Sequence, residues 1–549
     1  MGLGIRTKLA ALRRPRLSKL AAGVAGAPDA AVLKDLGAAL ADVQAKPVTV
    51  LDIGDPHEVM LEVWGQFFSD ATVIHATTEN LVELARDVRP GVIIDSGLGG
   101  DQGEAFRALY PVLAAKGVYV IAGADDDLRF TFLRRADAIA STERQRPPTD
   151  DFEAYLHTTS AAVTVEDDVV SATKKGHAQR VHLTRSVKDV SDAAVLRDVG
   201  EPYDRLPDAR IVGHTHRVEP QWAKLNAVTP VAFEPAASGE LTDVTVLSQG
   251  VVLTSDGDVV FETLNCAHNI RRSSGLYRPL DDSIWVTEAK PKKVRERFDD
   301  DRRYVLLKQT WDSNYGHWLI DSFPKMGLLQ EIADPADCTF VLNDHGDNPI
   351  RQIMIDSLAM AGVPEDNLLF LPVGGTYEFA RLTVLGALTQ HPIKKSPFAI
   401  EFLERIAGQH EPGAAKRIYL SRNATHRRRL VNEDEVLEVL APHGYVPVRT
   451  EELTLAEQMA VFAGADHVIG NMGAAMTNLA FSPRGVNVMS LATERMAHDY
   501  FYDIVCLKRG TYVGVQGRTT DDPPTMGSDF TIDINVLQTC INEWHGGPS

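Results

Sequence analysis

Three short segments of the chain carry side chains whose types and spacing suit work on a ligand. The densest is residues 417–433, which contains four arginines within eight residues: Arg422, Arg427, Arg428 and Arg429. Guanidinium groups pair well with the oxygens of phosphates. A run of charge is often only a solvated surface loop. Because this run follows a predicted strand in an acidic chain, where α/β sheets bind ligands, the residues favour an anion-binding site.

A second segment, residues 467–481, passes from a predicted buried strand into a short helix through small residues. Gly470 lies in the strand, and Gly473, Ala474 and Ala475 lie at the turn. Small side chains let a ligand approach the backbone N–H groups at a helix N-terminus, where a diphosphate is stabilised. Small residues also allow a helix to pack closely on a sheet. Taken alone, this segment leaves both interpretations open.

A third segment, residues 311–325, contains His317 and Asp321 four residues apart. If a helix begins at Gly316, both side chains lie on one face of it. A histidine beside a carboxylate suits proton transfer. Pro324 has no N–H and predicts a kink that turns Asp321 toward a substrate. The structural alternatives are an ion pair on a helix surface and a satisfied core histidine.

Two blocks of alternating strands and helices are predicted to position these segments. Short β-rich runs alternate with helical stretches in the first block, which predicts a parallel sheet with crossover helices. These runs are residues 47–53, 71–76, 91–95 and 117–121. The rhythm returns in residues 304–500, with predicted strands at 303–309, 339–343, 368–371, 417–421, 445–448 and 467–470. Between the blocks, a turn at residues 255–258 predicts a hairpin.

Two helix starts in the second block have capping signatures. Thr454 with Glu457 three residues later predicts a capping box that opens a helix ending at Gly464. Asn432 with Glu435 has the same spacing and predicts a second such start.

The charge and cysteine content exclude several classes of protein. The 549 residues include 56 basic and 75 acidic side chains, which gives a net charge of −19. Such a chain repels nucleic acid, so we expect no nucleic-acid partner. The four cysteines lie far apart without a C-x-x-C pair, which excludes the common zinc modules and favours a reducing compartment. No apolar run approaches the roughly 20 residues that span a bilayer. We therefore expect a soluble, cytoplasmic protein.

The first 20 residues are basic and carry no acid. Interleaved leucines allow peripheral contact with an anionic membrane surface, here the inner membrane face. The alternative is a solvated tail, because Pro15 interrupts any helix.

Taken together, the three segments resemble glycosyltransferase family 61. The resemblance is carried by residues 314–321 with Pro324, by Ser421-Arg422 with residues 428–433, and by residues 470–478. It extends from about residue 244 to about residue 484. Members of this family are inverting transferases of GT-B type, with two Rossmann-like lobes, UDP-sugar donors and no metal in the chemistry. Relatives more often have Pro-His-Gly-Ala-Gly at residues 471–475, where Met472 replaces the histidine, and arginine at His426.

The resemblance implies roles for individual residues. Arg422 and Arg429 are expected to hold the donor diphosphate, with Arg428 able to replace either. The other expected donor-binding residues are Asn471, Gly473, Ala474, Ala475, Thr477 and Asn478. An inverting transfer needs a group that takes the proton of the acceptor hydroxyl, and an aspartate is ionised at neutral pH. Asp321 is therefore the expected general base, and His317 is its neighbour and the alternative base. In that alternative, His317 takes the proton and Asp321 orients its ring.

The N-terminal block resembles a class I S-adenosylmethionine-dependent methyltransferase. Residues 92–97 and 117–121 match its fourth and fifth strands. The features that hold the cofactor are poor, because the first turn, residues 52–57, has one glycine and includes Pro56. The second strand ends at residues 75–78 without the acid that binds the ribose. We therefore expect a degenerate scaffold or docking domain that uses no cofactor.

These features predict an α/β protein with an N-terminal Rossmann-like domain followed by a GT-B-type pair of Rossmann-like lobes. The predicted parts are a basic segment (1–45), the methyltransferase-like domain (46–145), a linker (146–205), an acceptor-side lobe (206–400), and a nucleotide-sugar lobe with the C-terminal tail (401–549).

The predicted function is metal-independent, inverting hexosyl or pentosyl transfer from a nucleotide sugar to a glycan acceptor in capsule or cell-wall polysaccharide synthesis. The alternatives are a non-catalytic protein that binds nucleotides or glycans, and a bifunctional methyl- and glycosyltransferase.

Overall fold

The computed structural model describes residues 16–545, apart from several short stretches. The undescribed stretches within that range are residues 23, 25–26, 45, 54–57, 77–80, 97–101, 125, 141–150, 167–168, 177–178, 265–283, 289–292, 391–393, 424–426, 497–498, 522 and 524. Residues 1–15 of the basic N-terminal segment, Pro56 and His426 therefore lie outside the described residues. The chain forms two compact units: unit 1 is residues 1–184 with 275–292, and unit 2 is residues 185–274 with 293–549.

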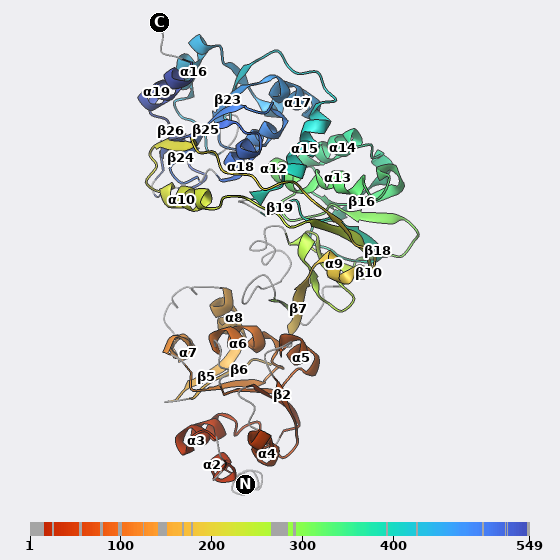
Figure 1. The fold of residues 1–549 in the computed structure, drawn as a ribbon, viewed down its shortest axis with the longest axis vertical. Coiled ribbons are helices and arrows are strands. Elements are labelled where there is room, and N and C mark those ends of the chain that lie inside the picture. The colour runs from red at the N-terminus through yellow and green to blue at the C-terminus, as the bar shows by residue number, and fades with distance from the viewer. Residues whose placement is uncertain are drawn as a thin grey trace. The chain divides into compact units, whose positions relative to one another are not determined.

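Unit 1 is built on one six-stranded sheet with the order β2-β1-β3-β4-β6-β5 (Figure 1). Its first four strands are parallel: β1 (Val48–Ile53), β2 (Ala71–Ala76), β3 (Val92–Asp95) and β4 (Val118–Ala122). They match the predicted strands. Two strands that were not predicted, β5 (Ser160–Val165) and the antiparallel β6 (Val169–Lys174), complete the sheet.

Helices cover both faces of the unit 1 sheet, because residues next to one another in each strand point to opposite sides. Helices α3 (Ala30–Ala39) and α4 (Glu58–Phe67) pack on the face that includes Val50. Helices α6 (Gln102–Leu109), α7 (Asp126–Ala140) and α8 (Asp151–Thr159) pack on the face that includes Leu51. Helix α5 (Leu81–Val88) lies between β2 and β3 in the chain.

The prediction of a linker at residues 146–205 is wrong, because helices and strands form most of this stretch. It contains α8, β5 and β6, which belong to unit 1, and also β7 (Gln179–Arg185) and β8 (Val195–Arg197). Strand β7 pairs with β13 (Ile284–Glu288). The prediction relied on strands that alternate with helices, which is the pattern of a parallel sheet. Strand β6 pairs antiparallel with β4 and needs no helix between itself and the next strand, so that pattern did not reveal it.

The first lobe of unit 2 has a mixed sheet. Its long central pair is β10 (Ala236–Leu247), antiparallel to β18 (Thr376–Val384). Parallel strands follow on one side: β15 (Arg303–Leu306), β16 (Cys338–Asp344) and β17 (Leu368–Pro372). Strands β11 (Val251–Leu253) and β12 (Val259–Val260) form the predicted hairpin. Helices α12 (Tyr315–His317), α13 (Lys325–Leu329) and α14 (Ile350–Met360) complete this lobe.

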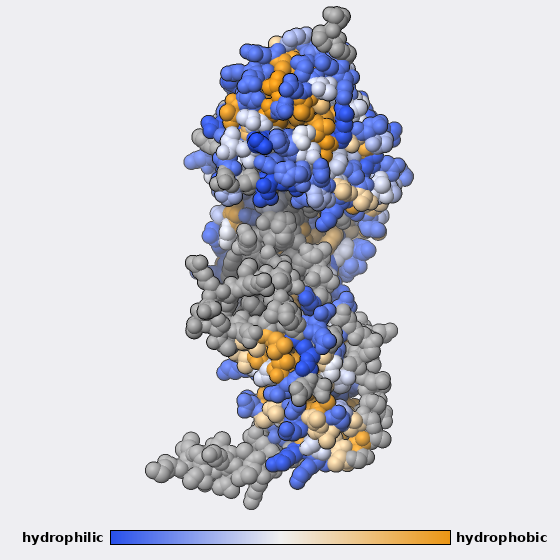
Figure 2. All heavy atoms as spheres, turned by 90° about the vertical axis from the view of Figure 1, so that its left-hand side faces the viewer, coloured by the Kyte–Doolittle hydropathy of each residue, from blue (hydrophilic) through white to orange (hydrophobic). Residues whose placement is uncertain are grey.

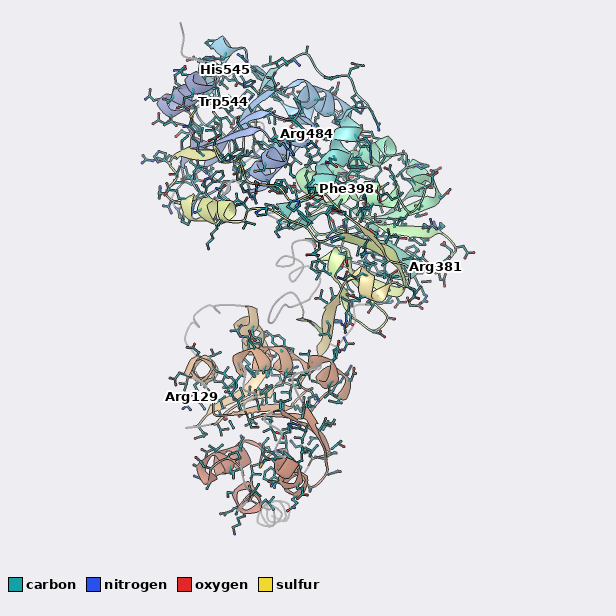
Figure 3. All side chains as sticks on the ribbon, in the orientation of Figure 1. Arg129, Arg381, Phe398, Arg484, Trp544 and His545 are labelled. Carbon is teal, nitrogen blue, oxygen red and sulfur yellow. The ribbon has the colours of Figure 1, made fainter. Side chains whose placement is uncertain are left out.

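The second lobe of unit 2 has the strand order β22-β21-β23-β24-β25-β26. Strands β21 (Arg417–Leu420), β22 (Val446–Val448), β23 (His467–Asn471), β24 (Asn487–Thr493) and β25 (Thr511–Thr519) are parallel, and β26 (Phe530–Thr531) is antiparallel. Its helices are α16 (Glu433–Leu440), α17 (Leu455–Gly464), α18 (Asp499–Leu507) and α19 (Ile534–His545). Trp544 and His545 at the end of α19 lie against His467 at the start of β23 (Figure 3).

A segment assigned by the sequence to the first lobe belongs to the second. Strand β9 (Arg210–Gly213) pairs in parallel with β25, and α10 (Glu219–Ala227) packs beside it. Trp222 of α10 places its ring 4.6 Å from that of Tyr502 and 6.1 Å from that of Tyr512. Burial of these aromatic rings holds the segment on the second lobe. The expected boundary at residue 206 is therefore wrong, whereas the expected two-lobed α/β architecture is confirmed.

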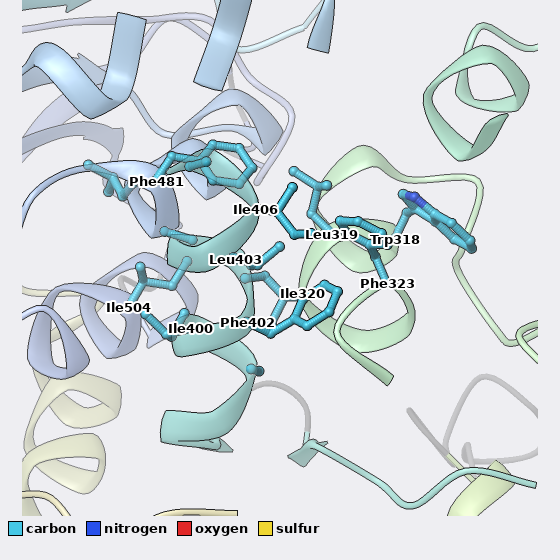
Figure 4. Close-up of a cluster of buried hydrophobic side chains, with 14 of the residues drawn as sticks. Trp318, Leu319, Ile320, Phe323, Ile400, Phe402, Leu403, Ile406, Phe481 and Ile504 are labelled. Atoms are coloured by element: carbon cyan, nitrogen blue, oxygen red, sulfur yellow. The ribbon is translucent and has the colours of Figure 1, made fainter. Parts of the chain in front are cut away.

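Helix α15 (Pro397–Ala407) joins the two lobes through one hydrophobic core. Figure 4 shows Phe402, Leu403 and Ile406 of this helix facing Leu319, Ile320 and Phe323 of the first lobe. The same core continues into the second-lobe sheet, so the lobes form one packed unit. Apolar side chains also gather on the surface of the second lobe (Figure 2). Its exposed hydrophobic residues include Val431, Val446 and Met526.

The two predicted capping boxes have different outcomes. At α17 the capping box of Thr454 and Glu457 is confirmed by reciprocal hydrogen bonds of 3.3 and 2.8 Å. The predicted box at Asn432 is wrong. The side chain of Asn432 binds the backbone N–H and carbonyl of Ile532, which ties the start of α16 to the segment before α19.

Candidate functional site

The third and second sequence segments pack directly on each other between the lobes. The Tyr315 hydroxyl, on α12, donates a hydrogen bond to Oδ1 of Asn478. Asn478 lies in the 3-10 helix η8 (Ala474–Phe481), and its Nδ2 donates to Gln458 at 2.8 Å. A Cβ atom at Gly316 would stand 2.6 Å from Oγ1 of Thr477, so only glycine fits there. Asn478 therefore holds the two segments together.

The arginine segment reaches the same place from the end of β21. The Arg422 guanidinium lies against the backbone of Gly473, where a Cβ atom would overlap with Nη1. Gly473 precedes η8 and has extended backbone. Ala474 and Ala475 follow it and are half-buried. The structure thus brings all three sequence segments to the carboxyl ends of strands, where parallel sheets bind ligands.

Arg428 lies close to Arg422 and Arg427. Burial, together with the positive charges of Arg422 and Arg427, lowers the pKa of Arg428 to about 10. Burial also lowers the pKa of Arg422, although Glu451 opposes this effect. Arg428 has a φ of +58°, which is strained for a residue with a side chain. An anion among these three guanidinium groups would relieve their mutual repulsion.

Arg429 is directed to a different partner. Its backbone N–H, Nε and Nη2 all donate to the carboxylate of Asp529, at 2.8, 2.9 and 2.7 Å. The guanidinium is also more than half exposed. The structure therefore brings Arg422 and Arg428 together, and it pairs Arg429 with Asp529.

Two buried polar side chains at this edge have no hydrogen-bond partner among the described residues. They are Asn471, through both Oδ1 and Nδ2, and Thr477, through Oγ1. Each unsatisfied buried group costs about 1–3 kcal/mol. A polar ligand beside Gly473 would satisfy these groups, which is a feature of a binding site. Met472, where relatives more often have histidine, is instead buried in the core shared by the lobes.

His317 and Asp321 form a close pair. His317 Nδ1 lies 2.7 Å from Asp321 Oδ2, and the two side chains are 13% and 1% exposed. The His317 ring centroid lies 4.9 Å from that of Trp311 and 5.7 Å from that of Tyr500. His317 therefore covers Asp321 and is the member of the pair that a ligand would meet first.

The helix geometry at this pair differs from the predicted kink at Pro324. Residues 318–322 form a π-helical turn, in which the N–H of Phe323 donates to the carbonyl of Trp318 at 2.8 Å. The turn directs Asp321 to His317 rather than to the surface. π-Helical turns of this kind occur frequently at functional sites.

A buried lysine lies close to the same carboxylate. Burial lowers the pKa of Lys325 to about 8, and the negative charges of Asp321 and Glu262 act in the opposite direction. Burial also raises the pKa of Glu262, whose carboxylate accepts hydrogen bonds from Ser186 and from the N–H of Val187.

A second histidine–aspartate pair lies in the first lobe and was not predicted from the sequence. His345 Nε2 lies 2.7 Å from Asp312 Oδ1. Asp312 lies in the third sequence segment, and His345 directly follows β16. The polar run Asn343-Asp344-His345 at a strand end is the signal that could have found it.

Three aspartates of the hairpin turn and of residues 299–301 pair with arginines. Asp258 accepts a hydrogen bond from Arg185, Asp300 binds Arg302, and Asp301 pairs with Arg381. Within the described residues, no group of three histidine, cysteine, aspartate or glutamate side chains has a metal-binding arrangement.

Two cavities lie away from the three segments. A cavity of about 320 Å³ in unit 1 is lined mainly by apolar residues such as Met60, Trp64 and Ile94, with Asp52 beside them. Burial raises the pKa of Asp52, and His75 partly opposes this. A cavity of about 610 Å³ in unit 2 is lined by residues 200–207 and by parts of α15 and α18, and it includes none of the predicted site residues.

No helix among the described residues has the length and apolar character that crossing a membrane requires.

Comparison with known proteins supports the resemblance of the second block. Residues 315–489 match the family model of glycosyltransferase 61, which confirms the resemblance for this part of the chain. No curated protein matches the chain.

Two matching solved structures are complexes of the MycE methyltransferase from the mycinamycin biosynthetic pathway. One contains Mg, SAH and mycinamycin VI, and the other contains Mg and SAH. The chain is 18% and 19% identical to them, with TM-scores of 0.24 and 0.25. The matches cover 30% of this chain, in its N-terminal part, and 54% and 55% of the solved chains. The chain thus spans about half the length of these structures.

Proposed function

We propose that this protein is a glycosyltransferase that moves a sugar from a UDP-linked donor to a hydroxyl of a glycan acceptor, with inversion. The observation that carries the proposal is the position of the Arg422 guanidinium against Gly473, with Arg428 beside it. This arrangement offers positive charge and close backbone approach to a diphosphate. The match of residues 315–489 to glycosyltransferase 61 supports the same conclusion.

In this proposal the second lobe binds the donor. Arg422 and Arg428 hold the diphosphate, and Arg429 supports the loop through Asp529. Gly473, Ala474 and Ala475 let the donor approach the backbone. Asn471 and Thr477 supply hydrogen bonds from side chains that lack described protein partners. Asn478 acts indirectly, because it already binds Tyr315 and Gln458.

The first lobe supplies the base. With Nδ1–H of His317 donated to Asp321, Nε2 is free of its proton and takes the proton of the acceptor hydroxyl. The acceptor oxygen bonds to the anomeric carbon as the bond from that carbon to the diphosphate breaks. The leaving UDP carries the electron pair, and the arginines stabilise its charge. Direct proton transfer to Asp321 is the alternative, and its low exposure of 1% argues against it.

Metal independence is part of the same proposal. Arg422 and Arg428 neutralise the leaving diphosphate, which a divalent cation would otherwise do. We expect activity to persist in EDTA. Loss of activity in EDTA and recovery with manganese would contradict this part.

Unit 1 is proposed to be a scaffold or docking domain that uses no S-adenosylmethionine. The bifunctional alternative requires that cofactor to bind there. We also propose a cytoplasmic enzyme of capsule or cell-wall polysaccharide synthesis, with residues 1–20 in peripheral contact with the inner face of the membrane. The net charge of −19 supports the absence of a nucleic-acid partner.

The experiment is a donor screen on the full-length protein. UDP and a panel of UDP-hexoses and UDP-pentoses are tested by thermal shift, and each donor is then followed for slow hydrolysis and for transfer. Binding with hydrolysis or transfer supports the enzyme. Binding of UDP with neither reaction supports the non-catalytic alternative, and no binding of any nucleotide overturns the proposal.

A further inference from the structure

A chain of buried polar groups crosses the first lobe and ends on His345. Asp312 binds Nε2 of His345 through one oxygen at 2.7 Å. Its other oxygen accepts hydrogen bonds from Asn343 Nδ2 at 2.8 Å and from the backbone N–H of Gln309 at 3.3 Å. Asn343 in turn accepts from Lys308, whose ammonium also donates to the carbonyls of Leu371 and Pro372.

This series of hydrogen bonds determines which ring nitrogen of His345 carries the proton. Lys308, Asn343 and Asp312 are each 1% exposed, so the aspartate is held as a fully bonded acceptor. A carboxylate in that state requires the N–H of His345 to be on Nε2. Nδ1 is then an acceptor. It has no hydrogen-bond partner among the described residues, and the His345 side chain is 13% exposed.

The neighbouring backbone relates this pair to the proposed base. Trp311 and Asp312 are adjacent, and Trp311 packs on His317 while Asp312 holds His345. Trp311 has a φ of +69°, a strained value for a bulky residue. Strain of this kind is found where the surrounding structure requires a particular placement. Gln309, whose backbone binds Asp312, also has a buried Nε2 without a described partner.

We propose that His345 binds the glycan acceptor: its Nδ1 accepts a hydrogen bond from an acceptor hydroxyl other than the one that His317 deprotonates. Asp312 is the positioning residue that keeps Nδ1 in the accepting form. This inference rests on the proposed function, since it names a contact for the acceptor of that reaction. The acceptor is preferred to the donor because the arginine cluster belongs to the second lobe, whereas His345 belongs to the first.

The experiment separates acceptor binding from donor binding. UDP-glucose, UDP-galactose, UDP-xylose and UDP-N-acetylglucosamine are the donors, and the methyl glycosides of these sugars are the acceptor probes. For His345→Ala we expect KM for the acceptor to rise about three- to tenfold, as for one lost hydrogen bond. We expect KM for the donor, UDP affinity and donor hydrolysis to stay unchanged.

Two further variants distinguish binding from structure. His345→Gln keeps a side-chain acceptor and recovers part of the acceptor KM. Asp312→Asn offers an amide donor to Nε2, which moves the proton of His345 to Nδ1, so the acceptor KM rises as in His345→Ala. His216→Ala, which removes a histidine that is 65% exposed at the start of the α10 region, is the matched control and stays like wild type.

An unchanged acceptor KM in His345→Ala, or no recovery in His345→Gln, overturns the inference. If the wild type neither transfers nor hydrolyses any of the donors, the proposed function has failed independently. Saturation-transfer NMR with the methyl glycosides then decides the inference. Binding to wild type that weakens in His345→Ala supports it, and no binding to wild type overturns it.

Discussion

The sheet of unit 1 and the sheet of the second lobe share a local topology but differ in chemistry. Each sheet contains three consecutive parallel strands of which the first lies between the other two, in the orders β2-β1-β3 and β22-β21-β23. Such a point, where the connections run in opposite directions, is where open α/β sheets bind ligands. Comparing the strand ends at these two points therefore shows what the topology alone does not determine.

The two edges present opposite charges, and they differ in how many of their polar side chains have hydrogen-bond partners. At the unit 1 edge, Asp52 faces His75, and Asp95 accepts a hydrogen bond from Tyr119 at 3.1 Å. At the second-lobe edge, Arg422 and Arg428 lie together, and Asn471 has no described partner. The first edge is acidic with internal partners, and the second is basic with an unsatisfied amide. A shared scaffold thus gives no common function, because the strand-end residues determine the ligand.

The largest expected effect is a loss of turnover in His317→Ala, which tests whether unit 2 carries out the sugar transfer. A positioned base contributes about 10²–10⁴-fold in rate. His317→Ala should therefore lose at least about a hundredfold in turnover, while UDP affinity stays near wild type. Steady-state kinetics and calorimetry measure the two quantities.

Asp321→Asn separates the two candidate bases. If Asp321 only orients His317, this variant also loses activity, because the amide favours the wrong form of the ring. Activity that survives His317→Ala but not Asp321→Asn would make Asp321 the base. If both variants remain active, the base lies elsewhere.

The second prediction sharpens the difference between neighbouring arginines. Hydrogen bonds to charged groups contribute about 1.5–3 kcal/mol each, so Arg422→Ala or Arg428→Ala should weaken UDP binding about ten- to a hundredfold. Arg429→Ala is the matched control, because it removes the same charge from a residue paired with Asp529. Calorimetry with UDP measures all three. Equal losses of UDP affinity in all three variants would show that UDP binding depends on the net positive charge of the loop and not on the position of each arginine.

The third prediction compares the ligands of the two edges. At a free concentration of 100 times Kd, UDP should stabilise the folded protein by about 2.7 kcal/mol. S-adenosylmethionine should give no thermal shift, because the unit 1 edge lacks the features that would hold it. A shift with S-adenosylmethionine would support the bifunctional enzyme and remove the contrast between the edges.

The smallest expected effect is a change of melting temperature when Asp52, at the acidic edge of the unit 1 sheet, is replaced. Burial raises the pKa of Asp52 above its ordinary value, so the folded protein binds the proton more tightly than the unfolded chain. The contribution of Asp52 to stability therefore falls as the pH rises through its folded pKa. Asp52→Asn should raise the melting temperature at neutral pH by about 2–4 °C at most.

The pH dependence provides the internal control for this variant. The gain should disappear below pH 3.8, where the carboxyl group is protonated in both states. Melting curves of the full chain at several pH values measure it. A loss of stability at neutral pH would show that the pair with His75 outweighs the cost of burial.

Features with local causes were predicted correctly. The alternation of β-rich runs with helical stretches identified β1, β2, β3 and β4, and the capping box at Thr454 depends on a residue three positions away. The convergence of the three segments followed from the family resemblance together with the rule that ligands bind at strand ends. Each of these predictions depends on residues close together in the chain or on a motif recorded in it.

Features with distant partners were not predicted. Asn432 binds Ile532, and Arg429 binds Asp529, each 100 residues away in the chain. The pairing of His345 with Asp312 spans 33 residues and depends on the register of β15 and β16. Local spacing does not identify such partners, because the packing of the whole fold decides them. A polar run such as Asn343-Asp344-His345 marks a strand end, but it does not say which residue His345 binds.

The pairing of β9 with β25 has a consequence for the order in which the protein assembles. The two strands are separated by about 300 residues, and most of the first lobe lies between them in the chain. At roughly 5–20 residues per second, a ribosome needs about 15–60 s to make that intervening stretch. During this time β9 and the aromatic face of α10 have emerged without their partners, and they remain exposed to other chains until residues 511–519 appear. Synthesis itself therefore leaves the newborn chain with an incomplete sheet, which closes only when β25 has been made.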